Sequence, residues 1–302
     1  MRTVAVVSSG AMGSAVGAAF AQAGDRVVAT VAGRSERTRA LAAAAGIELL
    51  ADLDTVVAEA DLVLSIVPPA EAVTVAGQIV EAASRTGSAP LVADWNAISP
   101  ATARQLERTL ADAGLELVDG SISGGPPRAG YRTRVYLSGQ RAEDIAARAP
   151  AGIDARVVGA EVGLASAVKM CTASMYKGSV GLLTHALLTA HAHGVLPQVL
   201  DDLEGSFPRQ VERAARLLAV SATKAHRYVG EMHEIAATQR DIGLTPALFE
   251  SMAEVYGALA ETSIAAEAPE AISAEPSLDD VLGRLSEACN GYSAGNDEED
   301  SG

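Results

Sequence analysis

Hydrophobic residues in the first half of the chain form short continuous runs, and longer alanine-rich stretches separate these runs. Runs bounded by Gly, Pro, Ser or Asp are typical of buried β-strands. The predicted strands are TVAVV, RVVATV, LVLSIV, LVADW, LELVD and RVYLSG. The predicted helices are residues 11–23, 36–45, 70–83 and 100–113. Alternation of this kind predicts an α/β domain whose mostly parallel sheet is covered by helices on both faces.

The pattern of the chain changes near Gly159. From Glu161 onward no strand-like run recurs, and glycine and proline interrupt a helical pattern. Residues 163–193 contain no proline and predict a single long helix. After Ser263 the chain is rich in Ala, Glu, Pro, Ser and Asp, which is typical of loosely held segments. The sequence thus predicts three parts: a doubly wound α/β domain (1–160), an all-helical domain (161–263) and an acidic, flexible tail (264–302).

Length and charge restrict the classes of partner. A chain of 302 residues is more typical of two domains than of one. A formal net charge of −15 argues against nucleic acid and anionic membrane surfaces as partners. Cys171 and Cys289 form neither a disulfide framework nor a metal-ligand pattern, and the histidines lack ligand partners at the required spacing. No apolar run reaches the length of a membrane span. We therefore expect a cytoplasmic protein without a bound metal.

The stretch SSGAMG, residues 8–13, lies where a dinucleotide-binding glycine loop would lie, between an apolar strand and a helix. Ser8 stands where the motif G-x-G-x-x-G has its first glycine, so that turn must form without a positive φ or with mild strain. Gly10 and Gly13 keep the second and third positions, which approach the pyrophosphate and pack the helix on the strand. We therefore predict a Rossmann-type domain in which Gly10, Ala11, Met12 and Gly13 contact a dinucleotide.

The end of the second strand indicates which dinucleotide is bound. An NAD enzyme places Asp or Glu there for the ribose 2′-hydroxyl. This chain reads VVATVAGRSERT, with no acid at the strand end and with Arg34, Ser35 and Arg37 just after it. Arginine and serine suit a 2′-phosphate through charge-assisted hydrogen bonds. The sequence predicts NADP(H), and the alternative is a polar loop whose arginines lie in solvent.

Four segments, in order along the chain, resemble the β-hydroxyacid dehydrogenase superfamily, which includes 3-hydroxyisobutyrate and 6-phosphogluconate dehydrogenases. GAMG resembles the end of the family's cofactor loop, and LSIVPP, with Val67 and Pro68, resembles the segment that borders the nicotinamide. DGSISGG, residues 119–125, resembles the substrate-binding signature, and GLASAVKMC, residues 163–171, resembles the segment that carries a catalytic lysine. KMCTASMYKG and VGEMHEIAATQRDIGLTP are most similar to a bacterial branch with a distinctive C-terminal domain.

The resemblance implies roles for particular residues. Lys169 would exchange a proton with the substrate oxygen as general acid or base while hydride moves between nicotinamide and substrate carbon. Ser123, Gly124 and Gly125 would hold the carboxylate of a small hydroxy acid or carbonyl acid. Asn96, after the strand LVADW, would either meet the cofactor or substrate or start a turn before the helix at Pro100.

The chain departs from the family pattern at two places. Thr172 and Ala173 occupy the positions of two asparagines in the hydroxyisobutyrate branch, the second of which touches substrate. A later lysine–acid pair of that branch aligns with Gly230 and Glu231. Lys177 lies eight residues after Lys169, about 80° round an ideal helix. The substrate contacts are therefore assigned to a set that includes new candidates: Thr172, Tyr176, Lys177 and Glu231.

The resemblance also implies a homodimer formed through the helical half, and the alternative is a compact monomer. Two other functions are open. An imine reductase would share the dinucleotide domain and the helical dimerisation domain, but those enzymes usually replace the catalytic lysine. A regulatory protein that senses a nucleotide without turnover would share the fold alone, since sites rather than folds carry function.

Overall fold

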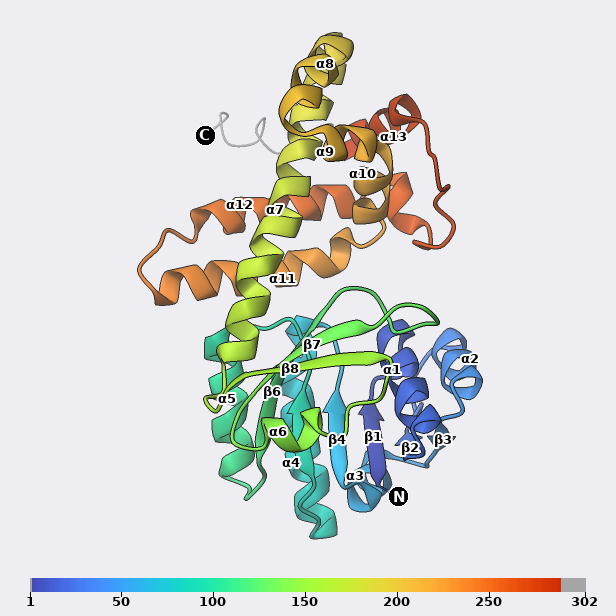
Figure 1. The fold of residues 1–302 in the computed structure, drawn as a ribbon, viewed down its shortest axis with the longest axis vertical. Helices are drawn as coiled ribbons and strands as arrows, with labels where there is room; N and C mark the ends of the chain where they lie inside the picture. Colours follow the sequence, from blue (N-terminus) through green and yellow to red (C-terminus); the bar gives the residue numbers. More distant parts are fainter. Residues whose placement is uncertain (1, 289–302) are drawn as a thin grey trace, which may run out of the picture. The chain divides into compact units, whose positions relative to one another are not determined.

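The first part of the chain is built on one eight-stranded sheet. The computed structural model describes residues 2–288, and the chain divides into two compact units, residues 1–171 and 172–302. The strand order is β3-β2-β1-β4-β5-β6-β7-β8, and only β6 and β7 pair antiparallel (Figure 1). The strands are β1 (Thr3–Val7), β2 (Arg26–Ala29), β3 (Glu48–Leu49), β4 (Leu62–Ser65), β5 (Leu91–Asp94), β6 (Leu117–Ser123), β7 (Thr133–Ser138) and β8 (Ile153–Gly159).

Helices cover both faces of this sheet because its strands alternate apolar side chains between two cores. Along β1, Val4 and Val6 face one core, while Ala5 faces the other. The first core receives α1 (Ala11–Gln22), α2 (Glu36–Ala44) and α6 (Ala142–Ala146). The second receives α3 (Leu53–Glu59), α4 (Ala72–Thr86) and α5 (Pro100–Ala111). The strand order reverses direction between β1 and β4, which is where doubly wound sheets bind their ligands.

The second unit is helical. Helix α7 (Leu164–Ala192) begins in the first unit and continues into the second. The further helices are α8 (Leu196–Ser206), α9 (Pro208–Glu212), α10 (Ala214–Ala222), α11 (Ala225–Asp241), α12 (Ala247–Ala260) and α13 (Leu278–Leu285). On α7, Gly178 and Gly181 lie against Phe249 and Met252 of α12, so the absence of side chains there allows close packing. Over the part of the chain that the structure describes, no helix has the length and apolarity needed to span a membrane.

The fold class predicted from the pattern is confirmed: a doubly wound α/β sheet is followed by a helical region. The pattern did not predict β3, β8, α3 or α6. Strand β3 has only two residues, both exposed, so it lacks the apolar run by which buried strands are recognised.

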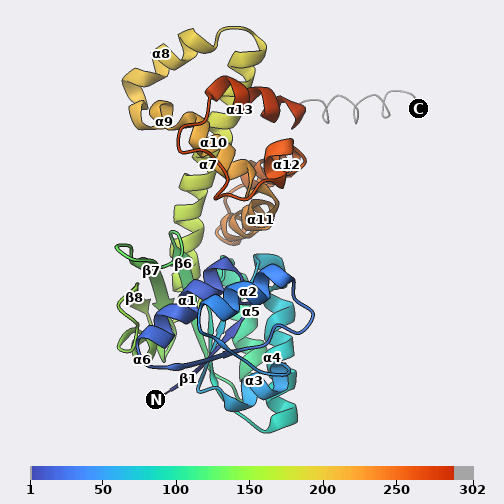
Figure 2. The same ribbon diagram turned by 90° about the vertical axis from the view of Figure 1, so that its right-hand side faces the viewer.

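The segment after Ser263 was expected to be flexible, but its first part is packed. Helix α13 lies beside α10 in both Figures 1 and 2. Its side chains Val281, Leu282 and Leu285 are buried, and Ser277 caps its first turn. An apolar stripe spaced by three and four residues explains this packing, although a composition rich in Ala, Glu and Pro hides it. The remainder of the expected tail, residues 289–302, lies outside the described residues.

Buried polar side chains connect the carboxyl ends of β4 and β5. Asp94, the last residue of β5, accepts hydrogen bonds from the backbone N–H and the side-chain amide of Asn96, at 3.1 and 2.6 Å. The same amide also donates to Ser65 Oγ at 3.1 Å, and its oxygen accepts from the N–H of Val67 at 2.6 Å. The bonds to Asp94 and Ser65 are buried and the bond to Val67 is partly buried, so Asn96 fixes the segment that follows β4.

Burial raises the pKa of the Asp94 carboxyl to about 7. The neighbouring Asp119 carboxylate adds to the rise, while the hydrogen bonds from Asn96 and Ser65 oppose it. A carboxyl whose folded pKa exceeds its unfolded pKa binds its proton more tightly in the native state. This tighter proton binding stabilises the native state fully below pH 4. The stabilisation is lost as the pH rises towards 7, because Asp94 then loses its proton in the native state as well.

We expect the Asp94→Asn variant to gain stability relative to the wild type as the pH rises from about 4 to about 7. A neutral side chain has no proton to lose, and each unit of pKa shift corresponds to about 1.4 kcal/mol. Urea unfolding of both proteins across this range measures the difference. Other carboxyl groups titrate in both proteins and cancel, so parallel stability curves would show that Asp94 keeps an ordinary pKa.

Candidate functional site

The loop between β1 and α1 adopts the shape of a dinucleotide-binding turn without its first glycine. Ser8 has φ +73°, and it is the sole non-glycine residue with a positive φ among residues 2–288. This is the left-handed conformation that glycine adopts without cost and that costs other residues roughly 1–2 kcal/mol. Of the two possibilities left open by the sequence, the structure has the strained one.

The rest of this loop fits a bound pyrophosphate. Gly10 is the N-cap of α1, and no atom lies within 4 Å of the position that a Cβ would occupy there. A Cβ on Gly13 would overlap the carbonyl oxygen of Ser8, so only glycine lets α1 start this close to β1. The hydroxyl of Ser9 is buried and has no hydrogen-bond partner within the described part of the chain. With Ala11 and Met12 in its first turn, α1 directs open N–H groups to the side where phosphates bind.

The three residues predicted to read a 2′-phosphate lie just after β2. Arg34 and Arg37 are exposed, and among residues 2–288 neither guanidinium forms an ion pair. Ser35 is the N-cap of α2, and its hydroxyl accepts the N–H of Thr38 at 3.3 Å. The hydroxyl of Ser35 thus has a structural role already, whereas the two arginines are available to an anion.

Val67 and Pro68 follow β4, as the LSIVPP motif suggested. Val67 is held by its N–H bond to Asn96, and Pro68 precedes the short turn Pro69–Glu71. Asn96 itself is buried with a 3 % exposed surface, and its amide bonds are internal. Ser99, not Asn96, caps α5. Asn96 therefore positions the loop that carries Val67, and its contact with a cofactor or substrate stays a prediction.

Asp119, at the start of the DGSISGG motif, fixes the beginning of α7. Its carboxylate accepts hydrogen bonds from the N–H of Gly163 at 2.9 Å and of Ser166 at 3.1 Å. It also accepts the hydroxyls of Ser166 at 2.7 Å and Ser138 at 2.9 Å. A fully buried carboxylate is stable with this many donors, and the positive end of the helix dipole adds to its stabilisation. The sequence contained Asp119 inside a recognised motif, but no pattern disclosed its partners.

This anchor places Lys169 beside the predicted substrate loop. The Nζ atom of Lys169 donates to the carbonyl oxygen of Ile122 at 2.8 Å. Ser123 is the next residue, at the end of β6, and it is partly exposed. Two segments 47 residues apart in the chain thus bring an ammonium group to the edge of the SGG loop. The arrangement can stabilise a carboxylate and can exchange a proton with a bound oxygen.

Two residues that the sequence analysis did not identify hold the glycines of this loop. The hydroxyl of Tyr131 accepts the N–H of Gly125 at 3.2 Å, and the hydroxyl of Thr133 donates to the Gly125 carbonyl at 2.7 Å. Gly124 has φ +118°, and a Cβ there would overlap the Tyr131 hydroxyl. The N–H of Gly125 is therefore engaged, which leaves the N–H of Gly124 and the hydroxyl of Ser123 for an anion.

A second group of predicted residues meets within the helical unit. Lys177 of α7 forms an ion pair with Glu231 of α11, and both side chains are largely buried. The ammonium lies 4.6 Å from the ring centroid of Tyr228, and Tyr256 Oη donates to the Lys177 carbonyl at 2.8 Å. Burial raises the pKa of Tyr228 to about 12. A lysine–acid pair is thus present, formed by Lys177 and Glu231, although glycine stands at position 230, where the hydroxyisobutyrate branch has its lysine.

The remaining two candidates differ in their surroundings. Thr172, on α7, is partly buried, and its polar groups are engaged. Tyr176 is 70 % exposed on the same helix. Among the described residues, Tyr176 forms no side-chain hydrogen bond to Lys177 or Glu231.

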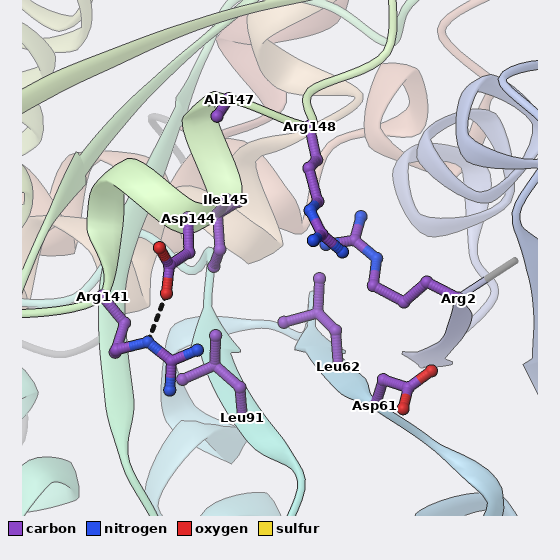
Figure 3. Close-up of a pocket in the computed structure, with 9 residues that line it drawn as sticks. All are labelled: Arg2, Asp61, Leu62, Leu91, Arg141, Asp144, Ile145, Ala147 and Arg148. Carbon is purple, nitrogen blue, oxygen red and sulfur yellow. Dashed lines mark hydrogen bonds and ion pairs between the residues drawn. The ribbon is translucent and has the colours of Figure 1, made fainter.

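A pocket of about 460 Å³ opens at the amino-terminal ends of strands β4 and β5, on the side of the sheet away from the glycine loop. Figure 3 shows the guanidinium groups of Arg2 and Arg148 extended towards each other across it. Arg141 is already paired with Asp144 and Glu116. The pocket contains none of the residues predicted from sequence, whose loops follow the carboxyl ends of the strands. The full lining is Arg2, Asp61, Leu62, Leu91, Arg141, Asp144, Ile145, Ala147 and Arg148.

Comparison with known proteins identifies both halves of the chain. Residues 3–151 match the NAD binding domain of 6-phosphogluconate dehydrogenase, and residues 190–259 match a domain of unknown function (DUF1932). An uncharacterized 28.5 kDa protein of Methanothermus fervidus is 28% identical over 177 residues. That match spans 58% of this chain and 65% of the length of the relative.

Solved structures share the whole architecture. A conserved hypothetical protein from Sinorhizobium meliloti is 26% identical with a TM-score of 0.66, covering 95% of this chain and 97% of its own. The 3-hydroxyisobutyrate dehydrogenase of Mycobacterium tuberculosis shares the fold at 20% identity with a TM-score of 0.62, over 94% and 99% of the two chains. An imine reductase from Myxococcus stipitatus does so at 21% identity with a TM-score of 0.56, over 86% and 93%.

The glycine loop, the Asp119 anchor and the paired domain matches lead to one assignment, which confirms the resemblance seen in the sequence. The chain carries a NAD-binding domain of the 6-phosphogluconate dehydrogenase type, followed by a domain of unknown function (DUF1932), and it shares its fold with 3-hydroxyisobutyrate dehydrogenase.

Proposed function

We propose that the protein is an NADP(H)-dependent oxidoreductase that acts on a small hydroxy acid or the corresponding carbonyl acid, with Lys169 as general acid and base. The observation that carries this proposal is the 2.8 Å hydrogen bond between Lys169 Nζ and the carbonyl oxygen of Ile122, directly beside Ser123. It brings a proton donor to a loop of small residues that suits a carboxylate.

The cofactor supplies or accepts the hydride when it is bound, and the chain supplies the remaining chemistry. Gly10 and Gly13 keep the loop open and close to the strand, so that the N-terminus of α1 can hold the pyrophosphate. Arg34 and Arg37 offer unpaired charge to a 2′-phosphate. Ser123 and the N–H of Gly124 orient the substrate carboxylate, and Lys169 delivers a proton to the oxygen during reduction or removes it during oxidation.

Replacement of Lys169 with alanine is expected to lower kcat by several orders of magnitude while the affinity for NADPH changes less than about threefold, because the lysine acts on the substrate oxygen. Consumption of NADPH with a panel of carbonyl acids, together with fluorescence titration of the cofactor, measures both quantities. A variant that retains the wild-type rate would remove Lys169 from the mechanism.

The same panel tests the other two functions when it includes cyclic imines. Reduction of imines in place of carbonyl acids would assign the protein to the imine reductases, whose fold it shares. Tight NADPH binding without turnover of any compound would favour a nucleotide-sensing regulator instead.

Arg34→Ala is expected to weaken NADPH binding by about tenfold or more and to leave NADH binding nearly unchanged. A charge-assisted hydrogen bond to the 2′-phosphate is absent from NADH, so its loss affects one cofactor alone. Calorimetric titration with both cofactors measures this, and Arg39→Ala, an exposed arginine further along α2, serves as the control. Equal losses for the two cofactors would exclude Arg34 as the reader of the phosphate.

The helical unit supports a homodimer. Helix α7 presents a solvent-facing stripe in the single chain, at spacings of four and three residues, which suits packing against another helix. Its members are Met175, Ser179, Leu182, Ala186 and Thr189. The two largest, Met175 and Leu182, are 70 % and 69 % exposed.

Leu182→Glu is expected to convert a dimer into monomers, because a charge in the centre of the stripe would lose its hydration on association. Sedimentation equilibrium distinguishes the 30.7 kDa chain from a species of twice that mass. Val158→Glu, at an exposed apolar position of β8, is the matched control and should leave the mass unchanged. A monomeric wild type would rule the dimer out.

A further inference from the structure

The loop after the SGG motif is built as a rigid turn. The backbone N–H of Arg128 donates to the Tyr131 carbonyl at 3.3 Å, and the N–H of Tyr131 donates to the Arg128 carbonyl at 2.9 Å. Gly130 turns the chain between them with φ +72°. Reciprocal bonds of this kind hold two side chains on one side of a narrow turn, so Arg128 and Tyr131 are presented together.

Tyr131 attaches this turn to the glycines of the substrate loop. Its hydroxyl accepts the N–H of Gly125 at 3.2 Å and lies where a Cβ on Gly124 would have to be. Thr133 holds the other side of the same residue through the Gly125 carbonyl at 2.7 Å. Glycine at position 124 is thus required for the tyrosine to reach the loop, and these contacts join the turn to the loop.

Arg128 is carried on this piece with its charge free. Its guanidinium carbon lies 4.6 Å from the centre of the Tyr131 ring, and Nη1 lies against Gly125. Within residues 2–288 it forms no ion pair, whereas Arg26, Arg85 and Arg134 each pair with a carboxylate. Stacking on an aromatic ring orients a guanidinium without neutralising it. In a chain of net charge −15, an oriented and unpaired arginine is suited to an anionic ligand.

The two cations lie at opposite ends of the same short loop. Lys169 binds at Ile122 and Arg128 lies at Gly125, and three residues of extended chain span at most about 10 Å. For a small acid whose carboxylate lies on Ser123 and whose reacting oxygen faces Lys169, Arg128 is a cation within reach of a second charged group. A neutral far end would leave the guanidinium unused.

We infer that Arg128 recognises a second anionic group on the substrate, so that the substrate class is a dianionic hydroxy acid or carbonyl acid. The inference rests on the proposed function, because the first carboxylate and the reacting oxygen are those assigned above. The far group is a carboxylate or a phosphate ester, since a planar guanidinium binds both through paired N–H donors.

The test compares carbonyl acids, with the carbonyl at C2 or C3, that have equal chain length and end in a methyl group, a carboxylate or a phosphate ester, with NADPH as reductant. We expect the wild type to favour one of the dianions. Arg128→Gln should raise the KM for that dianion about 30- to 100-fold and change the methyl-ended acid less than about threefold. Arg128→Lys should recover part of the loss, because it restores the charge without the planar fork. Arg148→Gln, at another exposed arginine that forms no ion pair within residues 2–288, is the matched control.

The outcomes distinguish a failure of the anion site at Arg128 from a failure of the proposed oxidoreductase function. Equal losses for both classes would give Arg128 a purely structural role, and a wild type that prefers the methyl-ended acid would overturn the dianion assignment while hydride transfer stands. If no acid is reduced, calorimetric titration of the NADPH-loaded protein with the same acids measures whether they bind. Dianion binding that depends on Arg128 without reduction would retain the anion site and reject the proposed function, and no binding of any acid would reject both.

Discussion

The candidate site depends on one buried carboxylate. Asp119 lies within β6 and accepts four hydrogen bonds, three of them from the first turn of α7 and its N-cap. The same strand ends in the SGG loop, and the same helix carries Lys169 one turn later. A single fixed point therefore sets the distance between loop and lysine. The buried carboxylate is stable only while every donor is in place, so the geometry of the site and the stability of the helix start cannot vary independently.

The first half of the fold could be predicted from the sequence because its central strands are continuous apolar runs. The exceptions follow the same rule: Glu48 and Leu49 are exposed, and a two-residue strand has no periodicity to detect. Helix α13 was not predicted because its three buried residues stand in a segment rich in polar residues. The overall composition of that segment indicated a flexible tail, although the spacing of the three residues is helical. The local hydrophobic pattern therefore predicts elements in which most residues are buried. It fails for elements in which only a few residues are buried, by contacts distant in the sequence.

The candidate site shows a similar division. The glycine loop, Ser123 and Lys169 could be predicted as candidates because each belongs to a short motif with its own local signal. Tyr131 and Thr133 could not be identified, because their role arises from hydrogen bonds to Gly125 across a turn. Asn96 was recognised as a polar residue at a strand end, but its internal bonding depends on β4, a neighbour only in space. Sequence motifs therefore indicate candidate groups, and tertiary contacts decide which of these groups have a hydrogen bond left for a ligand.

Ser8 has a consequence for how the loop responds to a ligand. Glycine at this position would let the backbone visit many conformations when nothing is bound, whereas serine reaches far fewer. The free-energy cost of the Ser8 conformation, with φ +73°, is therefore met when the domain folds, and the packing of Gly13 against the Ser8 carbonyl maintains this conformation. A dinucleotide then meets a loop that is already ordered, and its association loses less chain entropy than it would with a fully glycine-rich loop.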